Sequence, residues 1–286
     1  MNVYDVAERI GRIESLDKIA GPLADVVRRA LPQYSARKDV LNGTWLAHPL
    51  HPLLTDIPIG SFTSTTVLDL VGGSQSEHAA DLLLKLGLAS SVLTAAAGAA
   101  DWADKYGEES RTGAVHAIAN AVGVALYGAS GIARRSDRRG VATSLGLAGM
   151  AAMTIGGYLG GHLSFSQGVG VNNAFAQDQP REWTAVLAAA DLADGASMRV
   201  ETETATVLLY RRGNEIFAIG SCCSHAGGPL EDGDVDAQAL TVTCPWHQSV
   251  FRLDNGKVVH GPAVAPQGGY DTRVVNGRIE IRAAGA

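Results

Sequence analysis

Two short segments in the last third of the chain each pair a cysteine with a histidine. Cys223 and His225 form a C-x-H segment, and Cys244 and His247 form a C-x-x-H segment after an interval of residues 226–243. In a mixed-ligand [2Fe–2S] cluster, two thiolates hold one iron and two neutral imidazoles hold the other. Each segment supplies one ligand of each kind, so two short loops would hold the cluster between them. We therefore predict that these four residues are iron ligands.

A structural zinc ion is the alternative, because zinc also binds two cysteines with two histidines. Zinc hairpins favour two closely spaced cysteines followed by two closely spaced histidines, whereas the two residue types alternate here. The spacing therefore favours the cluster. Cys222 is an alternative ligand to Cys223, but the C-x-H spacing indicates Cys223, and we expect Cys222 to be a small buried side chain. His260 has no partner at a ligand spacing and is predicted to be an exposed loop histidine.

Residues 182–283 resemble the Rieske ferredoxins that serve bacterial aromatic-ring dioxygenases. The resemblance rests on Asp191-Leu192, on residues 223–233 and 244–251, and on the loop Gly261-Pro262-Ala263. It implies a [2Fe–2S] cluster covered by that loop, and single-electron transfer to a partner protein such as an oxygenase. Histidine ligation places the reduction potential of such clusters in a range of roughly −150 to +300 mV.

Two departures from the family pattern matter. Gln248 follows the second ligand histidine, where the family usually has glycine, so the geometry of this loop stays open. Trp246 stands between Cys244 and His247, and the extra cysteines of cytochrome bc-type Rieske proteins are missing, which implies the ferredoxin type and the lower part of the range of potentials. Only five residues follow Ile281, too few for the catalytic domain of a terminal oxygenase. We expect an electron carrier rather than a stand-alone catalyst, and assign no catalytic residue.

Short strands separated by glycine turns are predicted around these loops. Three Gly-Asn or Asn-Gly pairs, at 213–214, 255–256 and 276–277, are typical of tight hairpins. The predicted strands cover residues 199–203, 207–211, 216–220, 240–243, 250–253, 270–275 and 278–282. Residues 181–286 are therefore predicted to be all-β, a small antiparallel barrel or sandwich.

The charged residues are unevenly distributed. They make up 18% of the chain, below the roughly 25% usual for soluble domains, and the shortfall lies between about residues 49 and 177. The net charge of −6 and the lack of a basic stripe exclude nucleic acid as an expected partner. Three cysteines cannot build a disulfide framework, and no apolar segment typical of a cleavable signal peptide is found near the N-terminus.

Four apolar segments fill the charge-poor region. They cover about residues 57–73, 82–102, 112–133 and 140–177, and the last two carry no charge and exceed the ~20 residues needed to cross a bilayer. Small residues are frequent in all four, as in membrane helix interfaces. We predict a transmembrane four-helix bundle at 46–167, between a helical arm at 1–45 and a linker at 168–180 that leads to the domain at 181–286. A soluble, alanine-rich bundle is the alternative.

Residues 42–172 resemble a family of uncharacterised bacterial four-helix membrane proteins. The matching residues are the segment from His48 to Gly60, the pair Asp101-Trp102, His116, Gly156-Gly157 and Gly168-Val169-Gly170-Val171. The resemblance implies no function. Counting helices places His48, His51, His116 and His162 at one end of the bundle, with His78 at the other.

Histidines at one end of a helix bundle are typical of a haem or metal site, and equally of interfacial residues that meet lipid headgroups. We expect interfacial histidines first; the alternative is a redox cofactor between two of these four residues, haem b before a non-haem metal. The resulting hypothesis is a membrane-anchored Rieske protein that carries electrons between a membrane redox carrier and a partner protein. In the alternative, the helical half is itself an oxidoreductase supplied by the cluster.

Two further expectations concern the arrangement in the membrane. The thirteen-residue linker would span ~40 Å if fully extended, enough for the cluster to move between partners. Arg134, Arg135, Arg138 and Arg139 mark one face as cytoplasmic by the positive-inside rule, whereas the basic residues at the opposite face argue the reverse. With no export signal and no disulfide, we expect the Rieske domain to face the cytoplasm.

Overall fold

The computed structural model describes residues 2–286 and divides the chain into two compact units. The helical unit combines Met1–Pro32 with Leu50–Val169, and the β unit combines Gln33–Pro49 with Gly170–Ala286. A helical membrane-type half and an all-β half were predicted, and this fold class is confirmed. The structure adds residues 33–49 to the β unit, although they precede the bundle in the sequence.

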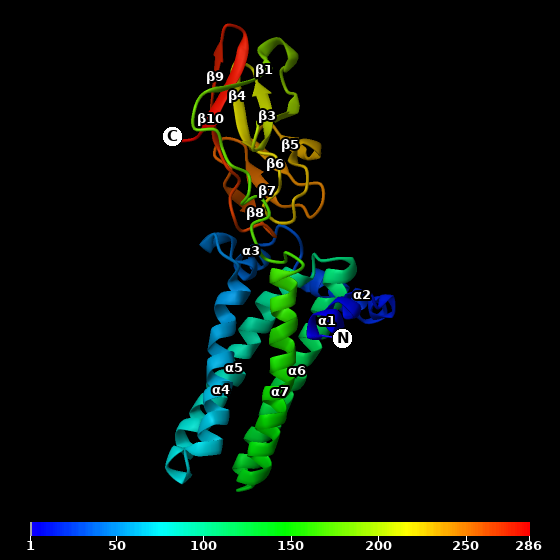
Figure 1. Cartoon of the computed structure of the whole chain (residues 1–286), viewed down its shortest axis with the longest axis vertical. Helices are drawn as coiled ribbons and strands as arrows, with labels where there is room; N and C mark the ends of the chain where they lie inside the picture. The colour runs from blue at the N-terminus through cyan, green and yellow to red at the C-terminus, as the bar shows by residue number, and fades with distance from the viewer. Residues whose placement is uncertain (1) are drawn as a thin grey trace. The chain divides into compact units, whose positions relative to one another are not determined.

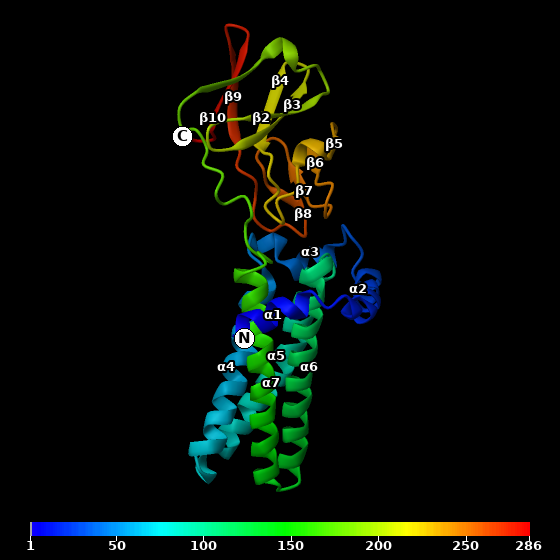
Figure 2. The ribbon, with the colours of Figure 1, turned by 45° about the vertical axis from the view of Figure 1, so that its right-hand side comes forward.

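Four long antiparallel helices make up most of the helical unit. They are α4 (Leu50–Val71), α5 (Glu77–Trp102), α6 (Gly107–Arg135) and α7 (Arg139–Phe165). Two shorter helices, α1 (Val3–Gly11) and α2 (Asp17–Ala30), lie across one end of them (Figure 1 and Figure 2). The helix α1 begins with a capping box, in which the side chains of Asn2 and Asp5 each accept a hydrogen bond from the other residue's backbone amide.

The bundle packs with its small residues inside and its large apolar residues outside. Gly87, Ala97 and Gly149 are buried, whereas Leu93, Ile132 and Ile155 are exposed. Outward apolar faces of this kind suit a lipid environment, because the helices of a soluble bundle present mainly polar faces to water. Among residues 2–286, three helices are long and apolar enough to cross a membrane, at 74–102, 107–135 and 139–165. The first predicted span, α4, is not one of them; it carries Asp56 and Asp69 and many threonines.

Three antiparallel sheets make up the β unit. Their strand orders are β1-β10-β9, β2-β3-β4 and β5-β6-β7-β8. The strands are β1 (Thr184–Ala188), β2 (Ser197–Glu201), β3 (Thr206–Arg212), β4 (Glu215–Gly220), β5 (Asp234–Asp236), β6 (Thr241–Thr243), β7 (Val250–Arg252), β8 (Val258–His260), β9 (Tyr270–Val275) and β10 (Arg278–Ala283). The helix α3 (Ala36–Asn42) belongs to this unit and is followed by a short turn that packs on β8.

The predicted linker is bonded to the β unit along much of its length. Asn173 donates its backbone amide to the carbonyl of Ser224 (2.9 Å), and the side-chain oxygen of Gln177 accepts the amide of Thr206 (2.7 Å). The carbonyl of Pro180 accepts the amide of Ala283 (2.6 Å). The segment is therefore not a free tether over its second half, because Asn173, Gln177 and Pro180 already have hydrogen-bond partners in this unit.

Candidate metal centre

The first ligand loop leaves β4 and turns tightly around Cys223. The amide of Cys223 donates to the carbonyl of Gly228 (2.8 Å), and the amide of Gly227 donates to the carbonyl of Cys223 (2.8 Å). Gly227 has a φ of +77°, a left-handed conformation that glycine adopts without steric cost. The turn therefore favours glycine at the fourth position after its cysteine.

The second ligand loop joins β6 to β7 and repeats the same turn. The amide of Cys244 donates to the carbonyl of Ser249 (2.8 Å), and the amide of Gln248 donates to the carbonyl of Cys244 (3.1 Å). The left-handed residue is again the fourth after the cysteine, but here it is Gln248, with a φ of +65°. The two loops are thus matched in backbone structure and differ in the residue at the strained position.

The two thiols meet in the interior. Cys223 and Cys244 are each 1% exposed and hydrogen-bonded to each other. That hydrogen bond, together with burial, raises the pKa of Cys223, and the same bond lowers the pKa of Cys244. Backbone amides of the two loops also donate to the sulfurs, those of 225–226 to Cys223 and those of 246–247 to Cys244. Amides directed at sulfur stabilise thiolates, which are the ligands that iron needs.

The two imidazoles lie side by side at the outer edge of the loops. The ring centroids of His225 and His247 are 4.8 Å apart and the ring planes are nearly perpendicular, at 85°. His225 is buried and His247 is half-buried, and the neighbouring Trp246 is 56% exposed. One edge of the centre therefore faces outward through His247 and Trp246.

Gly228 allows the two loops to approach each other. A Cβ atom at this position would lie 2.9 Å from Sγ of Cys244 and 3.1 Å from Cγ of Trp246.

Among residues 2–286, no three histidine, cysteine or acidic side chains converge on the position of a single ion. The buried thiols of Cys223 and Cys244 and the adjacent imidazoles of His225 and His247 are the donor set that suits a [2Fe–2S] cluster with a different ligand pair on each iron.

Neighbouring residues fix these loops to the rest of the unit. Ser224 donates its hydroxyl to the carbonyl of Ala265 (2.7 Å), and Ser249 accepts the amide of Ala263 (2.9 Å). These bonds connect both loops to the segment after Gly261-Pro262. Cys222 is half-buried; its sulfur lies 3.9 Å from the carbonyl oxygen of Asn173, and burial raises its pKa.

His260 was predicted to be an exposed loop histidine, and this is wrong. It ends β8, is half-buried, and its Nδ1 lies 2.8 Å from a carboxylate oxygen of Asp39. The two residues are 221 positions apart in the sequence, so no local spacing could have indicated the pair. The contribution of residues 33–44 to this site is the main feature that sequence reasoning missed.

The histidines of the helical half do not gather at one point. His51 and His116 face each other, with ring centroids 6.3 Å apart. His162 instead lies 3.2 Å from a carboxylate oxygen of Glu8 and packs against the ring of Tyr4. His48 belongs to the β unit, where its Nδ1 lies 2.9 Å from the carbonyl oxygen of Pro49. Only two of the four predicted residues are therefore brought together.

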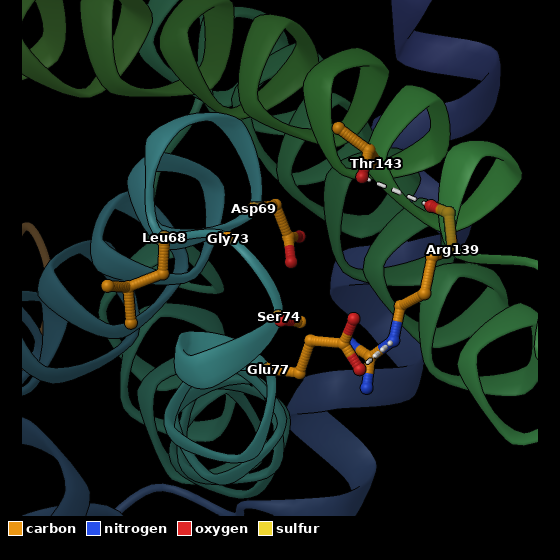
Figure 3. A pocket seen from close by; sticks show the side chains of 7 residues that line it. All are labelled: Leu68, Asp69, Gly73, Ser74, Glu77, Arg139 and Thr143. Carbon is orange, nitrogen blue, oxygen red and sulfur yellow. Dashed lines mark hydrogen bonds and ion pairs between the residues drawn. The ribbon is translucent and has the colours of Figure 1, made fainter.

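A polar cavity lies at the other end of the helical unit. It has a volume of about 240 Å³ and is lined by residues that include Asp69, Glu77 and Arg139 (Figure 3). Arg139 pairs with Glu77 (3.4 Å), and the deeply buried Arg134 pairs with Asp69 and with Asp81. Two of the four arginines that favoured a cytoplasmic face, Arg134 and Arg139, are therefore engaged in ion pairs.

Comparison with known proteins identifies both halves. Residues 182–275 match the family described as Rieske [2Fe-2S] domain, and residues 47–173 match the family described as predicted membrane protein (DUF2231). The 3-phenylpropionate/cinnamic acid dioxygenase ferredoxin subunit of Escherichia coli (strain K12) is 35% identical over 92 residues, which cover 32% of this chain and 85% of that protein. The protein of the same name from Shigella flexneri serotype 5b (strain 8401) matches equally.

A solved structure, the ferredoxin of carbazole 1,9a-dioxygenase from Nocardioides aromaticivorans IC177, is 28% identical and covers 35% of this chain and 97% of its own, with a TM-score of 0.34. Both resemblances stated from the sequence are confirmed by the family matches. The membrane match agrees with the outward apolar faces of the bundle and with its three apolar helices. The chain therefore belongs to the Rieske [2Fe–2S] family, and it carries this domain behind a domain of the predicted membrane protein family.

Proposed function

We propose that the protein is a membrane-anchored electron carrier whose cluster is held by Cys223, His225, Cys244 and His247. The observation that carries the proposal is the convergence of two matched loops, each with one cysteine and one histidine, on a buried pair of thiols. When bound, a [2Fe–2S] cluster accepts and releases one electron at a time. The protein supplies the thiolates, the amides that stabilise them, and an outward histidine edge.

The electron partner is proposed to be another protein, such as an oxygenase. The relatives in Escherichia coli and Shigella flexneri are named as ferredoxin subunits of a dioxygenase. Trp246, more than half exposed, and the half-buried His247 give a partner direct access to the imidazole edge of the centre. An aromatic side chain beside a ligand is a favourable contact for a transient protein partner.

Ligand substitutions test the assignment. Cys223→Ser and His247→Ala should abolish the EPR signal of the reduced Rieske cluster in the full chain, because each removes one of four iron ligands. Cys222→Ser is the matched control, since its sulfur lies beside the carbonyl of Asn173. Loss of the signal in the Cys222 variant, with Cys223 dispensable, would show that the register is wrong.

A second candidate function is a membrane oxidoreductase with a haem b or other cofactor in the helical half. The pair His51 and His116 favours it. Nδ1 of His51 lies 2.9 Å from the carbonyl oxygen of Thr94, and Nδ1 of His116 lies 2.7 Å from that of Gly156. Ligand histidines commonly donate one ring nitrogen to a carbonyl, which leaves the other nitrogen for the metal. A quinone at the same position is the alternative occupant, with the imidazoles as hydrogen-bond partners.

Spectra of the full chain separate these possibilities. If His51 and His116 bind haem, protein produced with haem supplied should show a Soret band that His116→Ala removes without changing the Rieske signal. His162→Ala is the control, because its ring is paired with Glu8. A wild-type protein without a Soret band refutes the haem, and a quinone-reductase assay then tests the other occupant.

The β unit is proposed to face the cytoplasm. Cys222 is a free thiol outside the proposed ligand set, and a free cysteine is typical of a reducing compartment. A membrane-impermeant maleimide should therefore fail to label Cys222 in intact cells and label it after lysis. Labelling in intact cells would place this unit outside.

A further inference from the structure

Residues 33–44 contact the second ligand loop and lie outside the segment that matches the Rieske family, which begins at residue 182. They form α3 and the turn after it, within the β unit. Four of their side chains, those of Gln33, Tyr34, Asp39 and Asn42, reach the loop around Gln248 or the loop around Gly261. We call these four side chains the brace.

Tyr34 holds the residue that follows the second ligand histidine. Its hydroxyl donates to Oε1 of Gln248 at 2.9 Å. Gln248 is left-handed, with a φ of +65°, where the matching position of the first loop is Gly227. Tyr34 is itself left-handed, with a φ of +61°. Two non-glycine residues in this conformation are both unfavourable, so the bond between their side chains joins two strained positions.

Asp39 and Gln33 hold Gly261 from both sides of its backbone. One carboxylate oxygen of Asp39 accepts the amide of Gly261 (3.0 Å), and the other lies 2.8 Å from Nδ1 of His260. Nε2 of Gln33 donates to the carbonyl of Gly261 (3.0 Å). Both the amide and the carbonyl of Gly261 are therefore hydrogen-bonded to the brace. The same loop is bonded to the second ligand loop, because the amide of Ala263 donates to the hydroxyl of Ser249.

The brace is well ordered by its own contacts. Nζ of Lys38, a residue only 3% exposed, donates to Oε1 of Gln33 (2.6 Å), which fixes the orientation of that amide. Ser35 caps α3 by accepting the amide of Lys38 (3.3 Å). Asn42 is fully buried, and a Cβ atom on Gly261 would lie 2.8 Å from its Nδ2. Position 261 therefore requires glycine, because any larger residue would clash with the side chain of Asn42.

We propose that the brace is a positioning element for the cluster: it fixes the backbone turn after His247, and Gln248 replaces the usual glycine in order to accept Tyr34. The proposal rests on the proposed cluster function and adds a determinant outside the Rieske domain. Potentials of iron–sulfur clusters depend on surrounding hydrogen bonds and on solvent exposure, and outer partners of metal ligands tune affinity. At the second loop the brace supplies such an outer hydrogen bond, from Tyr34 to Gln248.

A double-mutant cycle between Tyr34 and Gln248 tests the proposal in the full chain purified from membranes. Tyr34→Phe removes only the hydroxyl. It should speed the loss of cluster absorbance to an iron chelator several-fold and shift the EPR line positions and the reduction potential. Gln248→Gly restores the family residue and removes the strained side chain. In that background Tyr34→Phe should have no further effect, because the bond is already absent.

Two controls and a second variant keep the test decisive. Tyr158→Phe changes an exposed tyrosine of α7. Asp271→Asn breaks the ion pair between Asp271 of β9 and Arg282 of β10. Both variants should have the EPR lines, reduction potential and cluster lifetime of the wild type. Asp39→Asn should shift the EPR lines and the reduction potential as Tyr34→Phe does. It is a second brace variant that can be measured if Tyr34→Phe accumulates poorly. Additive effects in the cycle, or wild-type lines, potential and cluster lifetime in both brace variants, would overturn the proposal. A wild-type chain without a Rieske signal would instead refute the proposed function itself.

Discussion

Gly228→Ala is the substitution whose effect the structure predicts most sharply. The new methyl carbon would lie 2.9 Å from Sγ of Cys244 and 3.1 Å from Cγ of Trp246. Non-bonded heavy atoms are most stable at about 3.5–4.0 Å, so the loops must separate by roughly 0.6–1 Å. Metal–ligand distances tolerate only about 0.2 Å. The displaced sulfur should therefore leave the position that a cluster requires.

The fold should survive this change. Overpacking of this kind costs about 1–3 kcal/mol, whereas domains are stable by about 5–15 kcal/mol. We expect a folded chain whose iron content and Rieske EPR signal fall to a small fraction of wild type, measured together with circular dichroism of the same sample.

Gly227→Ala is the matched control. At Gly227 the nearest heavy atom to an added Cβ is 3.9 Å away, so the substitution introduces only the strain of a left-handed alanine, about 1–2 kcal/mol. This variant should keep its iron and its signal. If Gly228→Ala retains full iron and an unchanged spectrum, the close approach of the two loops is not what positions the ligands.

Two further predictions concern the helical unit. Arg134→Met should lower the free energy of unfolding by about 3–5 kcal/mol, because the buried Asp69 loses its partner, whereas Asp81 keeps Arg139. Thermal unfolding in detergent measures this, with the exposed Arg135→Met as control, and equal melting of the two variants would contradict it. Tyr127→Phe removes the hydroxyl that bonds Thr66 (2.7 Å) and should cost about 0.5–1.5 kcal/mol. The Rieske signal should stay unchanged in both variants. If Tyr127→Phe lowers the free energy of unfolding by more than about 3 kcal/mol, the substitution has displaced the ring and has not only removed the hydroxyl.

The site could be predicted where its signals are local. The cysteines and histidines of each loop lie two or three residues apart, and the ligand pattern is complete within 25 residues. The hairpin turns at 213–214 and 276–277 also follow from local turn chemistry, and the structure places β3–β4 and β9–β10 around them. Helices in the charge-poor region followed from length and composition.

What the sequence does not predict depends on long-range contacts. Nothing near Asp39 indicates that its carboxylate meets His260 and Gly261, which only the packed structure brings together. Gln248 was visible as a departure from the family, but its meaning needed Tyr34, more than 200 residues away. The histidines at the bundle end were indistinguishable by helix counting, because rotation about each helix axis decides which rings face each other.

The most direct test of the central claim is the EPR spectrum of the reduced full chain in washed membranes. We predict a Rieske signal that sediments with the membranes after a carbonate wash, with two irons per chain, and that disappears in Cys244→Ser. A signal released into the soluble fraction would contradict membrane anchoring, and membranes that contain the protein without any Rieske signal would contradict the proposed function.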